Sequence, residues 1–255
     1  PSDTTELRSR AACPELGARM VKKQPPFTVE EAKRAIYIDF EGTEVDEASF
    51  LGIFFVGDSG CEHFDQPVFE KALWPAARHH KPAEPDGYAA REASFRDTFV
   101  ELKERAESEG RKVFAYSTRE IKEIVARLTQ ERGIPERDIQ WWRDNLVNGL
   151  PHAKTWKKAN HDGVEFKKDK SKPKSGKYTL DQFQQLIDYP VPTVHGPGHT
   201  ASRIRYVRDM LTKHSGDYYA LQKGVKRKWT NVCRHNFHDC RSLRELMIRV
   251  AEDPL

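Results

Sequence analysis

Three short runs rich in β-branched and aromatic residues follow one another near the start of the chain, and they constrain its fold more than any other feature. They are Ala35–Phe40, Ser49–Val56 and Cys61–Asp65, and the turn Gly57–Gly60 separates the last two. Runs of this length predict β-strands, and a short glycine-containing turn between two of them predicts a hairpin. We therefore expect three consecutive antiparallel strands.

Helical and extended patterns alternate in the next part of the chain. Apolar residues at helical spacing predict a helix over Ala93–Gly110, with Gly110 as its C-terminal stop. The run Lys112–Tyr116 predicts a further strand. A second helix is expected from Thr118 to about Arg132, with Ser117 or Thr118 as its N-cap. Strands and helices in this order predict an α+β or mixed-sheet domain.

The remaining segments have a different character. Residues 151–178 contain nine lysines, several glycine, serine and proline residues and few apolar ones, which predicts a loop or flexible insertion. Residues 67–90 contain four prolines and predict a loop with a short helix. Residues 1–30 are polar and predict an N-terminal arm, which leaves 31–255 as the main domain. Further helices are expected over residues 179–187, 201–214 and 230–252.

Charge is distributed unevenly along the 255 residues. Residues 151–255 carry 21 Lys and Arg against 11 Asp and Glu, whereas residues 1–150 carry 22 against 28. This asymmetry favours a surface in the C-terminal part that faces a polyanion, although a solvated basic face without a partner explains the charge equally well. No stretch approaches the ~20 apolar residues of a membrane helix, and the polar N-terminus lacks the apolar segment of a secretory signal. We therefore expect neither a membrane protein nor a secreted precursor.

The four cysteines are Cys13, Cys61, Cys233 and Cys240, and no two of them form a CxxC pair. Scattered thiols of this kind fit the reducing environment of the cytoplasm, so a cytoplasmic location is expected. The segment from Cys233 to Cys240 holds four residues that can bind zinc. On a helix, however, these residues point around different faces, so one tetrahedral ion would not collect all four.

The strongest chemical signal is the pair Asp39 and Glu41 in the first predicted strand. Residues two apart on a strand project from the same face, and two adjacent carboxylates near an apolar sheet repel unless a cation holds them. A hard divalent ion with oxygen ligands is the natural occupant. The alternative is a strand end whose acids meet solvent or an arginine.

Two later segments supply further candidates. Glu120 lies in the first turn of the helix that begins at Thr118, where an acid can also serve only to favour the helix dipole. His235 and Asp239 are four residues apart in the last predicted helix, so they share one face and can approach one ion or one water molecule. The alternative for this pair is a His–Asp contact on the helix surface.

These segments, in this order, resemble the DEDD nucleases of the ribonuclease H-like superfamily. The most similar variant is a predicted ribonuclease H-like exonuclease family, whose last helix reads roughly Tyr-Asn-x-x-Asp-Cys. Here that helix stands as His235-Asn-Phe-His-Asp-Cys240. The family's strand-to-helix element is similar to Ala115-Tyr-Ser-Thr-Arg-Glu120, and a Tyr-Ser/Thr-Leu stretch is similar to Tyr178-Thr-Leu180. The resemblance spans residues 35–250, interrupted by the lysine-rich segment.

The resemblance implies a ribonuclease H-like α/β fold, in which three antiparallel strands and then parallel strands form one mixed sheet flanked by helices. It also implies two Mg²⁺ or Mn²⁺ ions, ~3.5–4 Å apart, that act on a scissile phosphate. Asp39 would bridge the ions, Glu41 and Asp239 would each complete one, and Glu120 would bind directly or through water. His235 would orient or deprotonate the attacking water.

Two features depart from the family pattern. Glu120 stands where most members have Asp, and His235 stands where the final helix usually has Tyr. The counterpart of the remaining acid is Asn148 or, in a shifted register, Asp144. If Asn148 is the counterpart, one metal ligand is missing and activity would be weakened or lost.

Binding of the polyanion would fall to basic residues of the C-terminal half, with Trp156 among them to stack on unpaired bases. The alternative for the tryptophan is ordinary packing. The basic candidates are Lys154, Lys157, Lys158, Lys167, Lys168, Lys226, Arg227 and Lys228.

Three functions follow from these observations. The first is a metal-dependent nuclease, a 3′–5′ exonuclease by resemblance, that hydrolyses DNA or RNA with single-stranded character. The second is a ribonuclease H-like module that binds nucleic acid but has weakened catalysis. The third is an interaction protein whose acidic N-terminal half binds a protein partner.

Overall fold

A six-stranded mixed sheet forms the centre of the computed structural model, which describes residues 27–43, 47–80, 89–168, 177–192 and 199–253. The strand order is β4-β3-β2-β1-β5-β6. β1 pairs antiparallel with β2, and β2 pairs antiparallel with β3; β5 is parallel to β1, β6 to β5 and β4 to β3. The strand bounds are β1 Ile36–Gly42, β2 Ala48–Val56, β3 Glu62–Val68, β4 Ala89–Glu92, β5 Val113–Ala115 and β6 Leu146–Asn148.

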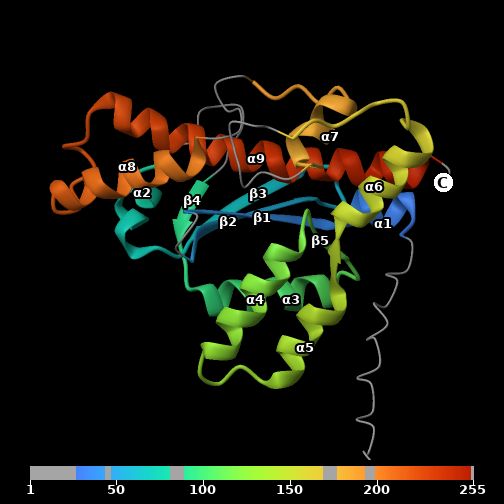
Figure 1. Cartoon of the computed structure of the whole chain (residues 1–255). Coiled ribbons are helices and arrows are strands. Elements are labelled where there is room, and N and C mark those ends of the chain that lie inside the picture. Colours follow the sequence, from blue (N-terminus) through green and yellow to red (C-terminus); the bar gives the residue numbers. More distant parts are fainter. Residues whose placement is uncertain (1–26, 44–46, 81–88, 169–176, 193–198, 254–255) are drawn as a thin grey trace, which may run out of the picture.

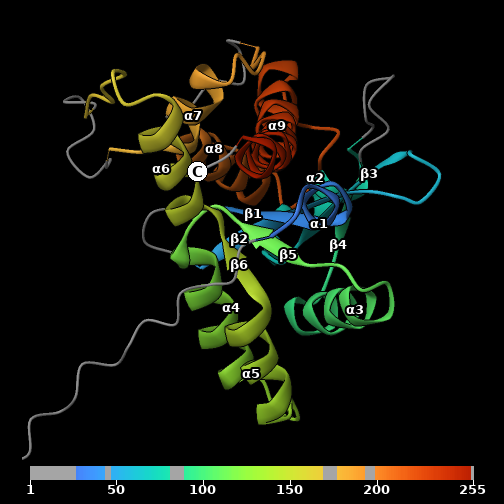
Figure 2. The same ribbon diagram turned by 90° about the vertical axis from the view of Figure 1, so that its right-hand side faces the viewer.

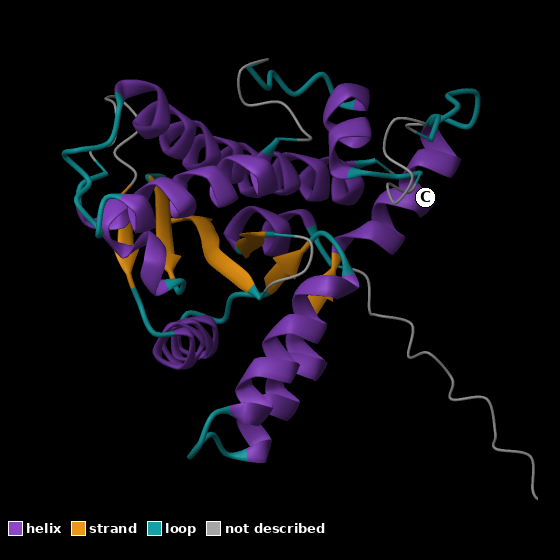
Figure 3. Ribbon diagram, turned by 60° about the vertical axis from the view of Figure 1, so that its left-hand side comes forward, coloured by secondary structure: helices purple, strands orange, loops and turns teal. Residues whose placement is uncertain are grey.

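Helices cover both faces of this sheet, so the chain is an α/β protein (Figure 1). On one face lie α3 (Phe95–Ser108), α4 (Thr118–Gln130) and α5 (Glu136–Asn145), below the sheet in Figures 1 and 2. On the other face lies the long α9 (Lys223–Glu252), and Figure 3 shows the strands as a layer between the two sets of helices. The other helices are α1 Val29–Arg34, η1 Lys71–Leu73, α2 Trp74–Arg78, α6 Gly149–Asn160, α7 Leu180–Leu186 and α8 Thr200–Lys213.

Side chains of β1 point alternately to the two faces of the sheet, so this strand contributes to the packing on both faces. Ile36 and Ile38 are fully buried against α3, α4 and α5, whereas Tyr37 belongs to the apolar cluster under α9. Successive side chains of a strand point to opposite faces, so Asp39 and Glu41 share the face of Tyr37. β1 therefore presents its two carboxylates to α9, while its isoleucines form the opposite core.

The three predicted antiparallel strands are confirmed, together with the Gly57–Gly60 turn, in which the Gly60 N–H donates to the Gly57 carbonyl at 2.9 Å. The predicted helices at α3 and α4 and the strand at β5 are also present. Gly110 ends the α3 segment with a φ of +61°, a conformation that glycine adopts without strain, and Ser117 caps α4. Helix α5 and the edge strands β4 and β6 were not predicted from the sequence, and α9 begins seven residues before the predicted start of the last helix.

The prediction of a loop or flexible insertion from residue 151 is wrong in its first part, because α6 occupies residues 149–160. Ala153 and Trp156 lie on the buried side of this helix and pack with Phe166 in the cluster under α9. The high lysine content of the segment led to the loop prediction, although its apolar residues have helical spacing. Residues 169–176, Cys13 and most of the arm expected over 1–30 lie outside the described residues.

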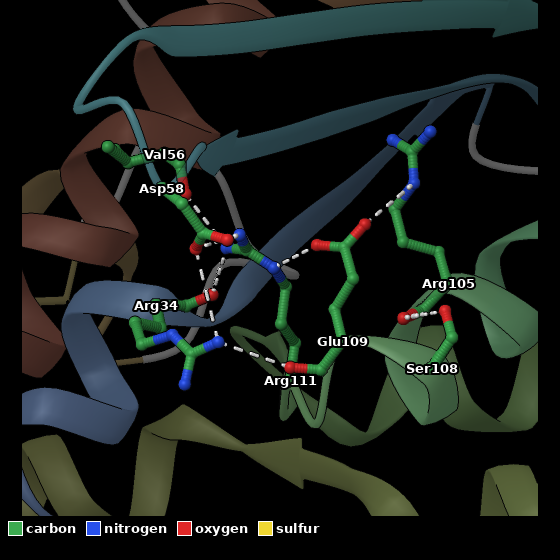
Figure 4. Close-up of polar contacts among 7 residues, drawn as sticks. All are labelled: Arg34, Val56, Asp58, Arg105, Ser108, Glu109 and Arg111. Carbon is green, nitrogen blue, oxygen red and sulfur yellow. Dashed lines mark hydrogen bonds and ion pairs between the residues drawn. The ribbon is translucent and has the colours of Figure 1, made fainter.

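A buried arginine joins the end of β2, the end of α1 and the start of β5 (Figure 4). The Arg111 side chain is 2% exposed, and its Nη1 donates to the carbonyls of Arg34 at 2.5 Å and Val56 at 2.8 Å. Its Nε donates to the Glu109 carboxylate, and its Nη2 lies 3.5 Å from Asp58 Oδ1. One guanidinium therefore satisfies two main-chain carbonyls and two acids.

We expect Arg111→Met to lower the free energy of unfolding by about 3 kcal/mol, because two main-chain carbonyls lose the buried guanidinium that donates to them. Urea unfolding at 25 °C measures the change. Arg105→Met is the matched control: its side chain is 47% exposed and lies 3.7 Å from the same Glu109, so its loss should cost less than about 1 kcal/mol. Equal losses in the two variants would contradict this assignment.

Candidate metal centre

The candidate site lies where the carboxyl-terminal half of β1 meets the middle of α9. Glu41 Oε1 lies 3.9 Å from His235 Nε2, which in turn lies 3.4 Å from Asp239 Oδ2. One ligand atom from each of these three residues lies within 4.8 Å of the other two. The structure thus brings Glu41 together with His235 and Asp239, although about two hundred residues of sequence separate them.

Asp39 is fixed beside this group by Asn236 of α9. The Asn236 side-chain amide donates to both the carbonyl and the Oδ2 of Asp39, at 3.0 and 2.9 Å. Gln66 on β3 donates to Asn236 Oδ1 at 2.9 Å, which fixes the orientation of the amide. A short chain of hydrogen bonds therefore connects β3, α9 and β1 at the position of the first predicted ligand.

The close approach of α9 to the sheet depends on a glycine. Gly52 of β2 stands opposite Asp39 in the antiparallel register. A Cβ atom at this position would lie 2.3 Å from Asn236 Oδ1 and 2.9 Å from Cys240 Sγ, both too close. A glycine within an apolar strand often marks such a close approach, so Gly52 is a signal that could have indicated the contact, although it was not predicted from the sequence.

Asp239 is oriented from its other side by α7. Gln184 Nε2 donates to Asp239 Oδ1 at 3.0 Å and to Ser242 Oγ at 2.7 Å. Helix α7 begins with a capping box formed by Thr179 and Gln182, and Thr179 belongs to the Tyr178–Leu180 stretch noted in the sequence. One Asp239 oxygen is thus held by Gln184, while the other faces His235. Neither Gln66 nor Gln184 carried a signal in the sequence.

Glu120 is buried in the first turn of α4. Its Oε2 accepts hydrogen bonds from the main-chain N–H of Ser117 at 3.2 Å and from the Ser117 hydroxyl at 2.8 Å. This capping box gives Glu120 a structural role at the helix N-terminus, where the alternative expected from the sequence was only a favourable interaction with the helix dipole. The carboxylate nevertheless lies close enough to Asp39 to affect its ionisation.

Four carboxyl groups have raised pKa values in this region. Burial is the largest cause for Asp39, followed by the negative charges of Asp239 and Glu120, and its pKa lies well above the usual range. The pKa of Glu41 is raised by burial and then by Asp39 and Asp239. Burial also raises the pKa of Asp239, against the effect of His235, and that of Glu120, against hydrogen bonds from Ser117.

These shifts mean that the site is costly to ionise. Arg119, exposed in the first turn of α4, lowers the pKa values of Asp39, Glu41 and Glu120, but burial and mutual repulsion outweigh it. Buried carboxylates that repel one another are stabilised by a bound cation. Carboxylate oxygens are suitable ligands for Mg²⁺ or Mn²⁺.

Neither candidate for the remaining acid belongs to this group. Asn148 ends β6, two strands away from β1, and its Oδ1 accepts a hydrogen bond from the Leu150 N–H at 3.1 Å as the cap of α6. Asp144 lies in the last turn of α5 and lines a small cavity with Arg111 and Lys112, at the start of β5. Glu120 follows the opposite end of β5.

The basic candidates separate into exposed and buried residues. Trp156 is 1% exposed and donates from Nε1 to Asp253 Oδ2 at 2.8 Å, so its ring is not available to stack on a base. Lys157 is also buried, and its Nζ donates to the His161 carbonyl at 3.2 Å. We correct both assignments: Trp156 joins α6 to the end of α9, and Lys157 donates to the C-cap residue of its own helix. Lys226 is partly buried, and the exposed candidates are Lys154, Lys158, Lys167, Lys168, Arg227 and Lys228.

No family model, curated protein or solved structure matches this chain. Within the part of the chain that the structure describes, every helix, including the 30 residues of α9, lacks the apolar length needed to traverse a bilayer. The proposals below therefore depend on the geometry of the site.

Proposed function

We propose that this protein is a divalent-metal-dependent nuclease that hydrolyses phosphodiester bonds of DNA or RNA, acting as a 3′–5′ exonuclease. The observation that carries this proposal is the meeting of Glu41, His235 and Asp239 within 4.8 Å, beside Asp39. The pKa values of Asp39, Glu41 and Asp239 are raised, which means that their negative charges are unfavourable where they lie. A bound cation would offset this cost.

The sheet topology supports the ribonuclease H-like form of the fold that the sequence resemblance implied. Strands β3-β2-β1-β5-β6 lie in this order, with β1 to β3 antiparallel and with β5 and β6 parallel to β1. The carboxylates lie on and beside the central strand, where several elements converge. β4 is an additional strand at the β3 edge.

Each residue has a role that its position allows. Asp39, Glu41 and Asp239 would hold Mg²⁺ or Mn²⁺ directly, and Glu120 would assist from α4. When bound, such ions polarise the phosphoryl group and lower the pKa of the attacking water. Asn236 and Gln184 keep the two aspartates in place, which preserves the spacing of the ligands.

His235 is the candidate to receive the proton of that water. Its Nε2 faces Glu41 and Asp239, while its buried Nδ1 has no hydrogen-bond partner among the described residues. A water molecule held between these three side chains could therefore give its proton to the Nε2 nitrogen.

The test is hydrolysis of end-labelled single- and double-stranded DNA and RNA, with Mg²⁺, Mn²⁺ or EDTA. We expect products shortened from the 3′ end, formed only with metal. Absence of hydrolysis on all four substrates, with either ion, would contradict the proposal.

A second candidate is a module that binds nucleic acid with weakened catalysis, and the position of Asn148 favours it. The residue that could have provided a further acid is an amide engaged in capping α6. Salt-sensitive binding of the same oligonucleotides without hydrolysis in Mg²⁺ or Mn²⁺ would select this candidate.

A further inference from the structure

Two exposed tyrosines lie on the hairpin formed by α8 and α9, each beside a lysine. Among the described residues, the exposed large hydrophobic side chains are Val164, Tyr206 and Tyr219. Tyr206 is 43% exposed, and Lys228 Nζ lies 5.4 Å from the centre of its ring. Tyr219 is 72% exposed, and Lys226 Nζ lies 5.9 Å from its ring.

The two pairs lie on different sides of α9. Lys228 precedes His235 by seven residues and Asp239 by eleven, so helical geometry places it within about 20° of each around the axis. Lys226 precedes His235 by nine residues, which places it about 180° away. Its partner Tyr219 contacts His79, with ring centres 4.7 Å apart.

Helix α8 brings Tyr206 to the side of α9 that carries the acids. α8 packs against α9 and also contacts β1, the strand of Asp39 and Glu41. Eleven residues of helix separate Lys228 from Asp239, about 16 Å along the axis. A tyrosine ring and an ammonium group therefore lie three helical turns from the candidate metal centre, on its own side.

We propose that Tyr206 and Lys228 bind single-stranded nucleic acid on its way to the metal centre, an inference that rests on the proposed function for the identity of the substrate. A base of an unpaired strand stacks on the exposed ring of Tyr206. The Lys228 ammonium binds a neighbouring phosphate. The bases of a duplex are already stacked on one another, so this pair selects unpaired strands.

Binding is measured by fluorescence anisotropy with a labelled 12-nucleotide oligo-dT, oligo-U and a hairpin duplex. The full chain carries Asp39→Asn and the buffer contains EDTA, so no hydrolysis intervenes. We expect Tyr206→Ala to weaken single-strand binding about 5- to 100-fold, the range for loss of one stacked base. Tyr206→Phe keeps the ring and should bind within about twofold of the parent. Lys228→Gln should lower the salt dependence by about one phosphate contact.

Tyr219→Ala is the matched control, because this tyrosine is also exposed beside a lysine but belongs to the pair on the opposite side of α9. It should leave single-strand binding within about twofold of the parent. The inference is overturned if Tyr206→Ala binds as tightly as the parent, if Tyr219→Ala weakens binding equally, or if the parent binds no oligonucleotide.

The nuclease proposal and the strand-binding proposal can be rejected independently of each other. Loss of binding in Tyr206→Ala, in a protein that hydrolyses no substrate, would support the strand-binding pair and reject the nuclease. Metal-dependent hydrolysis with an unchanged KM in Tyr206→Ala would support the nuclease and reject the pair.

Discussion

Replacing Asp39 by Asn is expected to reduce metal-dependent hydrolysis at least about a thousandfold while raising the thermal stability of the metal-free protein. The loss of activity follows because a ligand at the centre of the acid group loses its charge, and each bound ion supplies several kcal/mol of transition-state stabilisation. The asparagine side chain can still accept the hydrogen bond from Asn236, so the local fold is retained. kcat/KM and calorimetric melting in EDTA measure the two effects.

The gain in stability follows from the raised carboxyl pKa values. Consider a carboxyl group whose pKa is higher in the folded than in the unfolded chain. It makes its full contribution to the stability of the fold at pH values below its unfolded pKa of about 4. That contribution is lost as the pH rises through the folded pKa, so the metal-free protein loses stability as Asp39 and Glu41 ionise. Asp39→Asn removes one of these costs. At pH 7 the melting temperature should rise by at least about 2 °C, the shift that ~1 kcal/mol gives in a chain of this size.

In the presence of Mn²⁺ the parent should be more stable than Asp39→Asn, the reverse of their order in EDTA. Added Mn²⁺ stabilises the parent by binding only its folded form, whereas Asp39→Asn should gain little. Asp162→Asn, at an exposed position after α6, is the control and should behave as the parent in every measurement. An Asp39→Asn protein that retains hydrolysis, or that melts below the parent in EDTA, would contradict the assignment.

Gly52→Ala is expected to destabilise the fold by about 1–3 kcal/mol and to weaken metal binding and hydrolysis about a hundredfold. The added methyl group would overlap Asn236 and Cys240, so α9 must move away from β2 or Asn236 must release Asp39. A displacement of this kind, of about 1 Å, changes the spacing of Asp39 and Asp239 on which catalysis depends.

The coupling can be measured directly. In an Asn236→Ala background the main obstacle is gone, so the additional cost of Gly52→Ala should fall. Gly163→Ala is the control, because a Cβ there meets no atom within 4 Å. Urea unfolding and Mn²⁺ titration provide the measurements. If Gly52→Ala unfolds and binds Mn²⁺ as the parent does, the close contact is not a constraint.

Much of the central sheet could be predicted, because the residues that favour these strands and turns lie within the same short segments of the sequence. The strands from Ala35 to Asp65 combine β-forming residues with a glycine turn, and Ser117 with Glu120 marks the start of α4. The edge strands could not be predicted, because β4 (Ala-Ala-Arg-Glu) contains no β-branched or aromatic residue and the three residues of β6 directly follow α5. In α6 the apolar residues had helical spacing, but the lysines around Trp156 concealed it.

The candidate site shows the same division. Asp39, Glu41 and Asp239 could be identified because paired acids in an apolar setting are chemically distinctive. Gln66 and Gln184 could not, since an amide gains its role only when packing places it beside an acid. The spatial neighbours of Asp144 depend on which end of the sheet α5 reaches, which the sequence pattern does not encode.

The long helix α9 connects the candidate metal centre to a contact near the C-terminal end of the described chain. The helix has 30 residues without interruption, about 45 Å, and Asp239 lies near its midpoint. Its last turn leads into Asp253, which accepts the hydrogen bond from Trp156 about 20 Å beyond Asp239. Since Asp239 and this anchorage lie along one uninterrupted helix, we expect that losing the anchorage changes the distance between Asp39 and Asp239. In the proposed nuclease, a substitution of Trp156 would then lower hydrolysis although its ring is buried outside the candidate site.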